Sequence, residues 1–150
     1  MAEVYIKGLV KIGKRLMNIA NDVFTQSLKD EIGMFVIFSV QQRMDAGVDA
    51  HGKNFKPYSK RYARHREKTG RQTSPVNLTY HGSMRSAMTY ETDGDKIRTF
   101  FQDTEDQSGL SNAAKAYFLN QDRNFFALSK QDRKNIVEIV KDQIKTVVRG

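Results

Sequence analysis

The chain contains no cysteine among its 150 residues, and it has no long apolar run. Without thiols it can form neither a disulfide framework nor a thiolate nucleophile or metal ligand. The longest apolar run, Met34–Phe38, is far shorter than the roughly 20 residues that cross a bilayer, so we expect no membrane contact. The first residues lead directly into a basic amphipathic stretch without the apolar core of a secretory signal, and none is predicted.

The chain carries three histidines, and none belongs to a recognisable catalytic or metal-binding pattern. His51, His65 and His81 form no His-x-x-x-His or Glu-x-x-His pair, the type of spacing that places two metal ligands on one helix face. No nucleophile elbow and no complete phosphate-binding loop is present either. We therefore predict a protein without catalytic residues, metal or cofactor, and we rank an enzyme such as a nuclease last.

Positive charge is concentrated in one part of the chain, His51–Gln72, which is called the basic segment below. It holds eight Lys or Arg and one acid, Glu67, a net charge of +7 in a chain whose total is +8. A local excess of this size attracts polyanions or an acidic protein surface. These eight are the candidate residues that face DNA or a partner: Lys53, Lys56, Lys60, Arg61, Arg64, Arg66, Lys68 and Arg71.

Aromatic residues alternate with these charges, notably Phe55, Tyr58 and Tyr62. Basic residues mixed with aromatic ones are typical of surfaces that contact a phosphate backbone. An acidic neighbouring protein is the other partner that such a surface fits, and a solvated loop whose charge only aids solubility is the alternative to both. No helix-turn-helix or other base-reading module is visible, so sequence-specific reading of DNA is not predicted.

Apolar residues recur at three- and four-residue steps in three places, which predicts three helices. The first covers Val4–Asn21. The second begins after Thr25, a candidate N-cap, and ends at Ala46-Gly47, although its centre, Met34–Phe38, also has the composition of a buried strand. The third is the amphipathic C-terminal helix, which follows Ser129-Lys130-Gln131-Asp132, a sequence that resembles a capping box.

A hairpin is predicted in the second half of the chain. Two strands, Ala87–Thr92 and Lys96–Gln102, are joined by Asp93-Gly94-Asp95, and Asp-Gly is among the stronger hairpin signals. Short helices are predicted on either side of this hairpin, one capped by Ser83 and the other covering Asn112–Asn120.

Gly47–Asn77 has few apolar residues with any period, and Pro57 and Pro75 interrupt it. We predict an extended basic loop here, with one or two helical turns starting at Tyr58–Tyr62. The whole chain, residues 1–150, is predicted to form one α+β domain. It combines N-terminal helices, a small antiparallel sheet with a hairpin, the long basic loop or arm, and the C-terminal amphipathic helix.

Three motifs occur in the order and spacing of one known family. They are Gly52-Lys53-Asn54-Phe55-Lys56-Pro57-Tyr58-Ser59, then Leu78-Thr79-Tyr80-His81-Gly82-Ser83-Met84-Arg85-Ser86-Ala87, then Arg123-Asn124-Phe125-Phe126-Ala127-Leu128-Ser129. Together they resemble the virion morphogenesis and tail-completion (head–tail joining) proteins of tailed bacteriophages. Two departures stand out: Phe55 replaces the family's usual Trp, and Ala116–Asn120 lacks the family's His and Gly.

The resemblance implies a non-enzymatic structural protein of the phage neck or tail end. Such a subunit forms a ring, expected as a hexamer, that completes the tail and joins it to the head connector. Its implied partners are other copies of itself, the connector or stopper, the tail terminator or tail tube proteins, and DNA passing the channel. The implied location is the virion, after assembly in the host cytoplasm. The alternative is a small nucleic-acid-binding protein that acts through the basic segment.

The motifs also indicate residues expected to pack: Phe55, Pro57, Tyr58, Gly82, Phe125 and Phe126. A stopper, a tail-completion protein and a tail terminator all fit the same motifs. In each case we expect the basic residues to serve assembly and not the fold. We therefore expect that replacing four of them by Glu abolishes assembly and leaves the fold intact. The four are Lys60, Arg61, Arg64 and Arg66.

Overall fold

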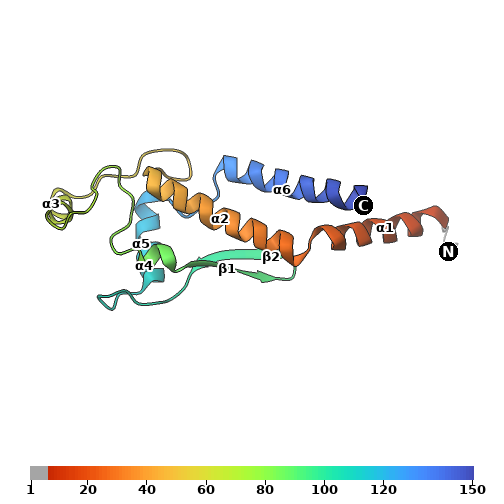
Figure 1. Cartoon of the computed structure of the whole chain (residues 1–150), viewed down its shortest axis with the longest axis horizontal. Coiled ribbons are helices and arrows are strands. Elements are labelled where there is room, and N and C mark those ends of the chain that lie inside the picture. The colour runs from red at the N-terminus through yellow and green to blue at the C-terminus, as the bar shows by residue number, and fades with distance from the viewer. Residues whose placement is uncertain (1–6) are drawn as a thin grey trace, which may run out of the picture.

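The structure of the chain is a computed structural model that describes residues 7–150. Within that range six helices accompany one two-stranded antiparallel sheet, which confirms the α+β fold class (Figure 1). In chain order the elements are α1 (Lys7–Val23), α2 (Gln26–Ala46), α3 (Lys60–Lys68), α4 (Ser83–Ser86), β1 (Met88–Asp93), β2 (Lys96–Phe101), α5 (Asn112–Arg123) and α6 (Lys130–Arg149). Residues 4–6 of the first predicted helix lie outside the described range.

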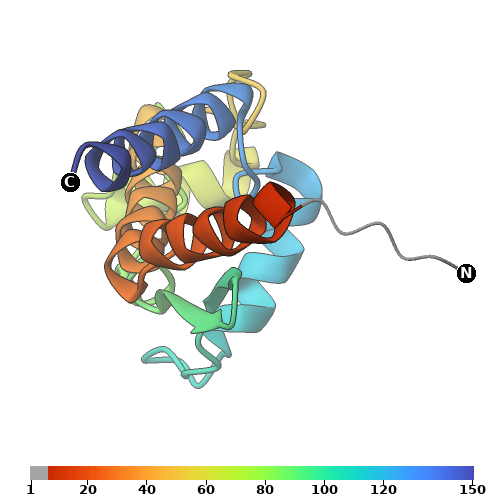
Figure 2. The ribbon, with the colours of Figure 1, turned by 90° about the vertical axis from the view of Figure 1, so that its right-hand side faces the viewer.

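Helix α2 is the middle layer, with the hairpin on one side and α6 on the other (Figures 1 and 2). It begins as predicted, because Thr25 Oγ1 accepts a hydrogen bond from the N–H of Leu28 at 3.2 Å. It ends at Gly47, whose φ of 70° is left-handed. A Cβ at Gly47 would stand 2.7 Å from Cβ of Pro75, so close packing requires glycine there as well. The strand-like stretch Met34–Phe38 is helical.

The predicted hairpin is confirmed, and each strand end lies within one residue of the prediction. The strands pair from Met88 opposite Phe101 to the tight Gly94-Asp95 turn. Tyr90 of β1 lies against α2 at Gly33, where the missing side chain makes room for the ring. This contact fits the hairpin closely against the middle helix.

The apolar core has two parts. The larger one joins the C-terminal half of α2 to the loop after it, α4, the hairpin and α5, through Val40, Met44, Phe55, Val76, Leu78, Met84, Met88, Ala116 and Phe125. The smaller one lies near the N-terminal half of α2, through Val23, Leu28 and Ile32 with Ile136, Ile139, Val140 and Val147 of α6. These α6 side chains pack against α1 and α2, whereas Val137, Ile144 and Val148, which belong to the same predicted apolar stripe, remain exposed.

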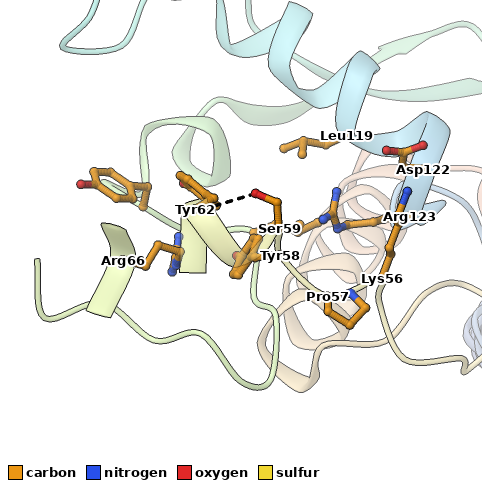
Figure 3. Close-up of a pocket in the computed structure, with 11 residues that line it drawn as sticks. Lys56, Pro57, Tyr58, Ser59, Tyr62, Arg66, Leu119, Asp122 and Arg123 are labelled. Atoms are coloured by element: carbon orange, nitrogen blue, oxygen red, sulfur yellow. Dashed lines mark hydrogen bonds between the residues drawn. The ribbon is translucent and has the colours of Figure 1, made fainter. Parts of the chain in front are cut away.

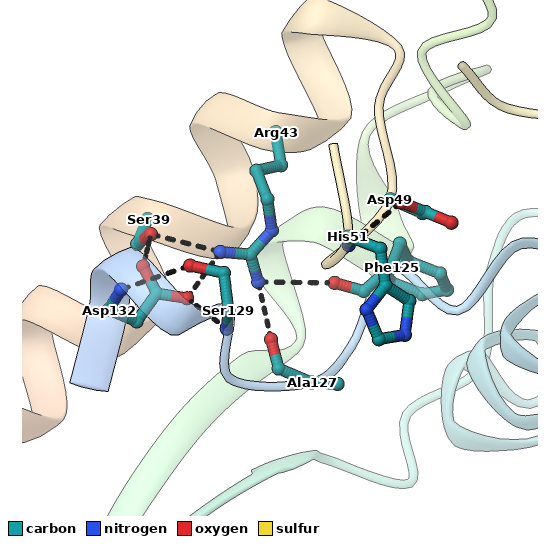
Figure 4. A network of polar contacts seen from close by, with 8 residues as sticks. All are labelled: Ser39, Arg43, Asp49, His51, Phe125, Ala127, Ser129 and Asp132. Atoms are coloured by element: carbon teal, nitrogen blue, oxygen red, sulfur yellow. Dashed lines mark hydrogen bonds and ion pairs between the residues drawn. The ribbon is translucent and has the colours of Figure 1, made fainter. Parts of the chain in front are cut away.

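A buried polar network joins α2 to the start of α6 (Figure 4). Arg43 Nη1 donates to Asp132 Oδ2 at 2.5 Å, and Arg43 Nη2 donates to the Ala127 carbonyl at 2.6 Å. Asp132 also accepts hydrogen bonds from the Ser39 hydroxyl and from the N–H of Ser129. Ser129 Oγ in turn accepts the N–H of Asp132 at 3.0 Å, which confirms the predicted capping box.

The loop prediction for Gly47–Asn77 requires a correction. Helix α3 occupies nine residues of it, more than the predicted turns at Tyr58–Tyr62, and Ser59 caps it by accepting the N–H of Tyr62 at 3.3 Å. An apolar period does not reveal this helix, because it packs few apolar side chains against the core. Its only fully buried residue is Arg66.

Candidate functional site

The basic segment forms one end of the elongated molecule, beyond the C-terminal end of α2 (Figure 1). Arg71 is partly buried and Arg66 is only 2% exposed. Arg66 therefore departs from the prediction that all eight basic residues face a partner. The other six are exposed and available to a polyanion: Lys53, Lys56, Lys60, Arg61, Arg64 and Lys68.

Arg66 holds the segment together from within. Its Nε donates to the carbonyl of Gln72 at 2.7 Å, and its Nη2 donates to the carbonyl of Thr79 at 2.8 Å. Its guanidinium carbon lies 4.7 Å from the centre of the Tyr58 ring, within cation–π range. No ion pair among the described side chains, those of residues 14–150, involves Arg66. Backbone carbonyls and tyrosine rings are therefore its partners, and they tie α3 to the loop after it.

The sequence carries a signal for this arrangement that the loop prediction does not include. Tyr58, Tyr62 and Arg66 stand four residues apart, which places them along one face of a helix. A loop prediction makes no use of that spacing, because the spacing is regular only on a helix. A planar guanidinium offers donors in a fixed fork together with a face that stacks on aromatic rings, so Arg suits this position better than Lys.

Five aromatic rings on and next to α3 contact one another in succession and are called the aromatic row: Tyr58, Tyr62, His65, Tyr80 and His81. The Tyr62 and His65 rings stack at 6.3 Å, and the His65 and Tyr80 rings lie nearly parallel at 6.1 Å. His65 Nε2 and the Tyr80 hydroxyl are 3.1 Å apart. Arg71 covers the Tyr80 ring at 4.3 Å. Hydrogen bonds with Thr69 and Arg71 lower the pKa of Tyr80, and the charges of Arg71 and Arg66 add to that effect.

A pocket of about 430 Å³, called the α3–α5 pocket, opens between α3 and α5 beside this row (Figure 3). Arg66 and Arg123 approach the Tyr58 ring, with guanidinium carbons 4.7 and 5.8 Å from its centre. Burial raises the pKa of Tyr58, so its phenol stays neutral between the two cations. The polar and aromatic lining includes Lys56, Tyr58, Tyr62, Arg66, Asp122 and Arg123. Cations outnumber carboxylates there.

The motif residues expected to pack have different surroundings. Phe55 and Phe125 are buried in the larger core, and Tyr58 and Phe126 are partly buried against it. Pro57 is exposed and lines the α3–α5 pocket. Gly82 precedes α4 with a φ of 83°, and a Cβ added there would meet nothing within 4 Å. Glycine at that position serves backbone conformation and not packing.

Several large apolar side chains remain exposed outside the basic segment. On and just after α1, Leu16 (60%), Met17 (68%) and Phe24 (51%) form the α1 patch. On α5, Tyr117 (64%) and Phe118 (67%) form the α5 patch, with their ring centres 5.5 Å apart. α1 and α5 lie at different positions along the long axis of the molecule (Figure 1). Exposed large apolar side chains of this kind are often covered by partner proteins.

The part of the chain that the structure describes contains no group of three or more His, Asp or Glu placed to hold a metal ion. Nor is any described helix long and apolar enough to cross a membrane. Comparison with family models, curated proteins and solved structures finds no match to this chain. The phage resemblance therefore rests on the sequence motifs quoted above.

Proposed function

We propose that the chain is a non-enzymatic structural subunit of a phage neck or tail end. Several copies form a ring, with six as the expected number, that completes the tail and joins it to the head connector. The neighbours in this proposal are the connector or stopper on one side and the tail terminator or tail tube proteins on the other. The protein would be assembled in the host cytoplasm and become part of the virion.

The observation that carries this proposal is the presence of two different exposed apolar surfaces, the α1 patch and the α5 patch. A ring is built from heterologous contacts, in which one surface of a subunit meets a different surface of the next. A two-fold dimer would instead need only one self-complementary surface. Two unlike patches at different positions along the molecule therefore support a ring better than a dimer. The exposed cations of the basic segment support an acidic neighbour or DNA as a further contact.

Native mass spectrometry of two complementary variants tests this proposal. One variant carries Leu16→Asp and Met17→Asp in the α1 patch, and the other carries Tyr117→Asp and Phe118→Asp in the α5 patch. We expect closed rings from the wild-type protein and monomers from each variant. A mixture of the two variants should give heterodimers and no rings, because each pair of molecules retains one intact interface.

Two results would contradict the proposal. A wild-type protein that stays monomeric at high concentration would show that these patches do not mediate self-assembly. Wild-type dimers that are broken by only one of the two variants would indicate a single two-fold interface. Circular dichroism of each variant provides the control for folding, since both patches are exposed and the substitutions should leave helix content unchanged.

A second candidate is a small nucleic-acid-binding protein that acts through the basic segment. The juxtaposition of exposed cations with the aromatic row favours it. Counterion release would make such binding fall steeply as salt rises. A monomer that binds DNA tightly at low salt and forms no ring would favour this candidate over the first.

A further inference from the structure

The α3–α5 pocket holds positive charge without a matching negative charge. Arg66 is almost fully buried and Arg123 is partly buried, yet neither takes part in an ion pair among residues 14–150, whose side chains the structure describes. The Nε of Arg123 is buried and has no hydrogen-bond partner among those residues. Asp122 contributes the one carboxylate to the lining, against three cations. A buried cation without a counter-charge is costly, so a bound anion would stabilise this arrangement.

The rings beside the pocket define what else the ligand should carry. Tyr62 and Tyr80 belong to the pocket lining and continue into the aromatic row through His65 and His81. Tyr62 is 39% exposed. A second hollow of about 450 Å³ lies along the same four rings, so a ligand can extend from the pocket onto the row. Aromatic faces stack on planar π systems, and base stacking of this kind tolerates any base.

We propose that the α3–α5 pocket and the aromatic row bind single-stranded nucleic acid. A backbone phosphate would sit against Arg123 and Lys56, with the buried charge of Arg66 behind them, and the adjoining base would stack on the exposed ring of Tyr62. A strand of this type joins an anion to a planar ring at every unit, which matches the two features of the site. Binding here does not require ring assembly, so this proposal is independent of the structural function above; it rests on the second candidate, nucleic-acid binding through the basic segment, and names its site and ligand class.

Two other polyanions match the site less well. Duplex DNA presents phosphates but keeps its bases paired inside the helix, so the aromatic row would have nothing to stack on. An acidic peptide supplies carboxylates but no planar ring at each unit. Duplex DNA and polyglutamate are therefore two of the three comparison ligands in the test.

The experiment measures fluorescence anisotropy of a labelled oligothymidylate of about 12 nucleotides, a length within the usual range of single-strand sites. Three unlabelled competitors are added in turn: duplex DNA of the same length, a strand of the same length without bases, and polyglutamate. We expect the oligothymidylate to bind, and the three competitors to bind at least about 10-fold more weakly. If the strand without bases binds as tightly as the oligothymidylate, the proposed base stacking is wrong. If polyglutamate binds more tightly than the oligothymidylate, the pocket is a site for an acidic protein segment.

Matched variants separate the pocket from general charge. Arg123→Gln and Arg64→Gln each remove one positive charge, but only Arg123 lines the pocket. Tyr62→Leu and Tyr117→Leu each remove one exposed ring, but only Tyr62 belongs to the row. We expect about a 10-fold loss of oligothymidylate affinity for the pocket and row variants, and less than about 3-fold for their controls. Equal losses of affinity for a variant and its control would overturn the proposal, because they would show that binding depends on overall charge and hydrophobicity and not on the pocket and the row.

Discussion

The ring of Tyr90 lies directly on the backbone of α2 at Gly33. A Cβ built on Gly33 would stand 2.5 Å from Cδ2 of Tyr90, too close for any side chain. The Tyr90 hydroxyl donates to Asp30 Oδ1 at 3.1 Å, one turn earlier in the same helix. Gly33 therefore has a packing function in the middle of a helix, where glycine would otherwise be unfavourable.

Gly33→Ala should destabilise the protein, although alanine favours a helix by about 1 kcal/mol. Overpacking against the Tyr90 ring costs about 1–3 kcal/mol, so after the helix gain is subtracted we expect a net loss of up to about 2 kcal/mol in the free energy of unfolding. Urea denaturation measures this change in the free energy of unfolding. In a Tyr90→Ala background the same substitution should stabilise the protein by about 1 kcal/mol, since the obstructing ring is gone. Destabilisation in both backgrounds would show that the ring is not the cause.

The Arg43–Asp132 pair predicts a dependence of stability on pH. Burial alone would raise the pKa of Asp132, but hydrogen bonds from Ser39 and Ser129 and the charge of Arg43 together lower it. A carboxyl whose folded-state pKa is lowered contributes stability that is fully present above its unfolded-state pKa of about 3.9. That contribution is lost as the pH falls through the lower, folded-state pKa.

Asp132→Asn should accordingly lower the free energy of unfolding by about 3 kcal/mol at pH 7, because it leaves the largely buried side chain of Arg43 without its counter-charge. The difference in the free energy of unfolding between the wild-type protein and the variant should narrow as the pH falls below about 3.9. Urea unfolding at a series of pH values measures this difference. Asp45→Asn is the matched control. Asp45 pairs with Arg85 at the surface, and its loss should cost less than about 1 kcal/mol. A pH-independent effect of Asp132→Asn would exclude the ion pair as its source.

The elements that the sequence predicts well are those whose signals are local or periodic. Thr25 and Gly47 mark the ends of α2, the Asp-Gly turn marks the hairpin, and the Ser129–Asp132 box marks α6. α3 is different, because one buried arginine holds it through carbonyls that lie six and thirteen residues further on. Such contacts have no apolar period, so sequence reasoning finds the charge of the basic segment but not its internal order.

Arg66→Lys should loosen the basic segment while leaving the core folded. An ammonium group cannot reproduce the forked donors to Gln72 and Thr79, and losing one charged hydrogen bond costs about 1.5–3 kcal/mol. Hydrogen exchange of amides in α3 should therefore quicken by between about 10- and 100-fold, with α2 unchanged. Arg64→Lys, at an exposed position of the same helix, should leave exchange as it is. Equal protection in both variants would refute the structural role of Arg66.

The buried position of Arg66 also changes the design of the assembly experiment. Glu at position 66 would place a carboxylate against carbonyl oxygens, so a variant that includes it would confuse loss of fold with loss of contact. The informative variant reverses only three exposed charges in α3: Lys60→Glu, Arg61→Glu and Arg64→Glu. We expect it to keep the helix content and the melting temperature of the wild-type protein, because surface substitutions typically change stability by less than about 0.5 kcal/mol.

The same variant should lose its contact with acidic neighbours or DNA, because the α3 surface would change from positive to negative. Lys130→Glu, Arg133→Glu and Lys134→Glu form the matched control, since they reverse three exposed charges at the start of α6. Binding to isolated phage neck and tail components, measured by co-sedimentation at low and moderate salt, should fail for the α3 variant and persist for the α6 variant. Loss in both would indicate attraction by net charge alone, and retention in both would remove the basic segment from assembly.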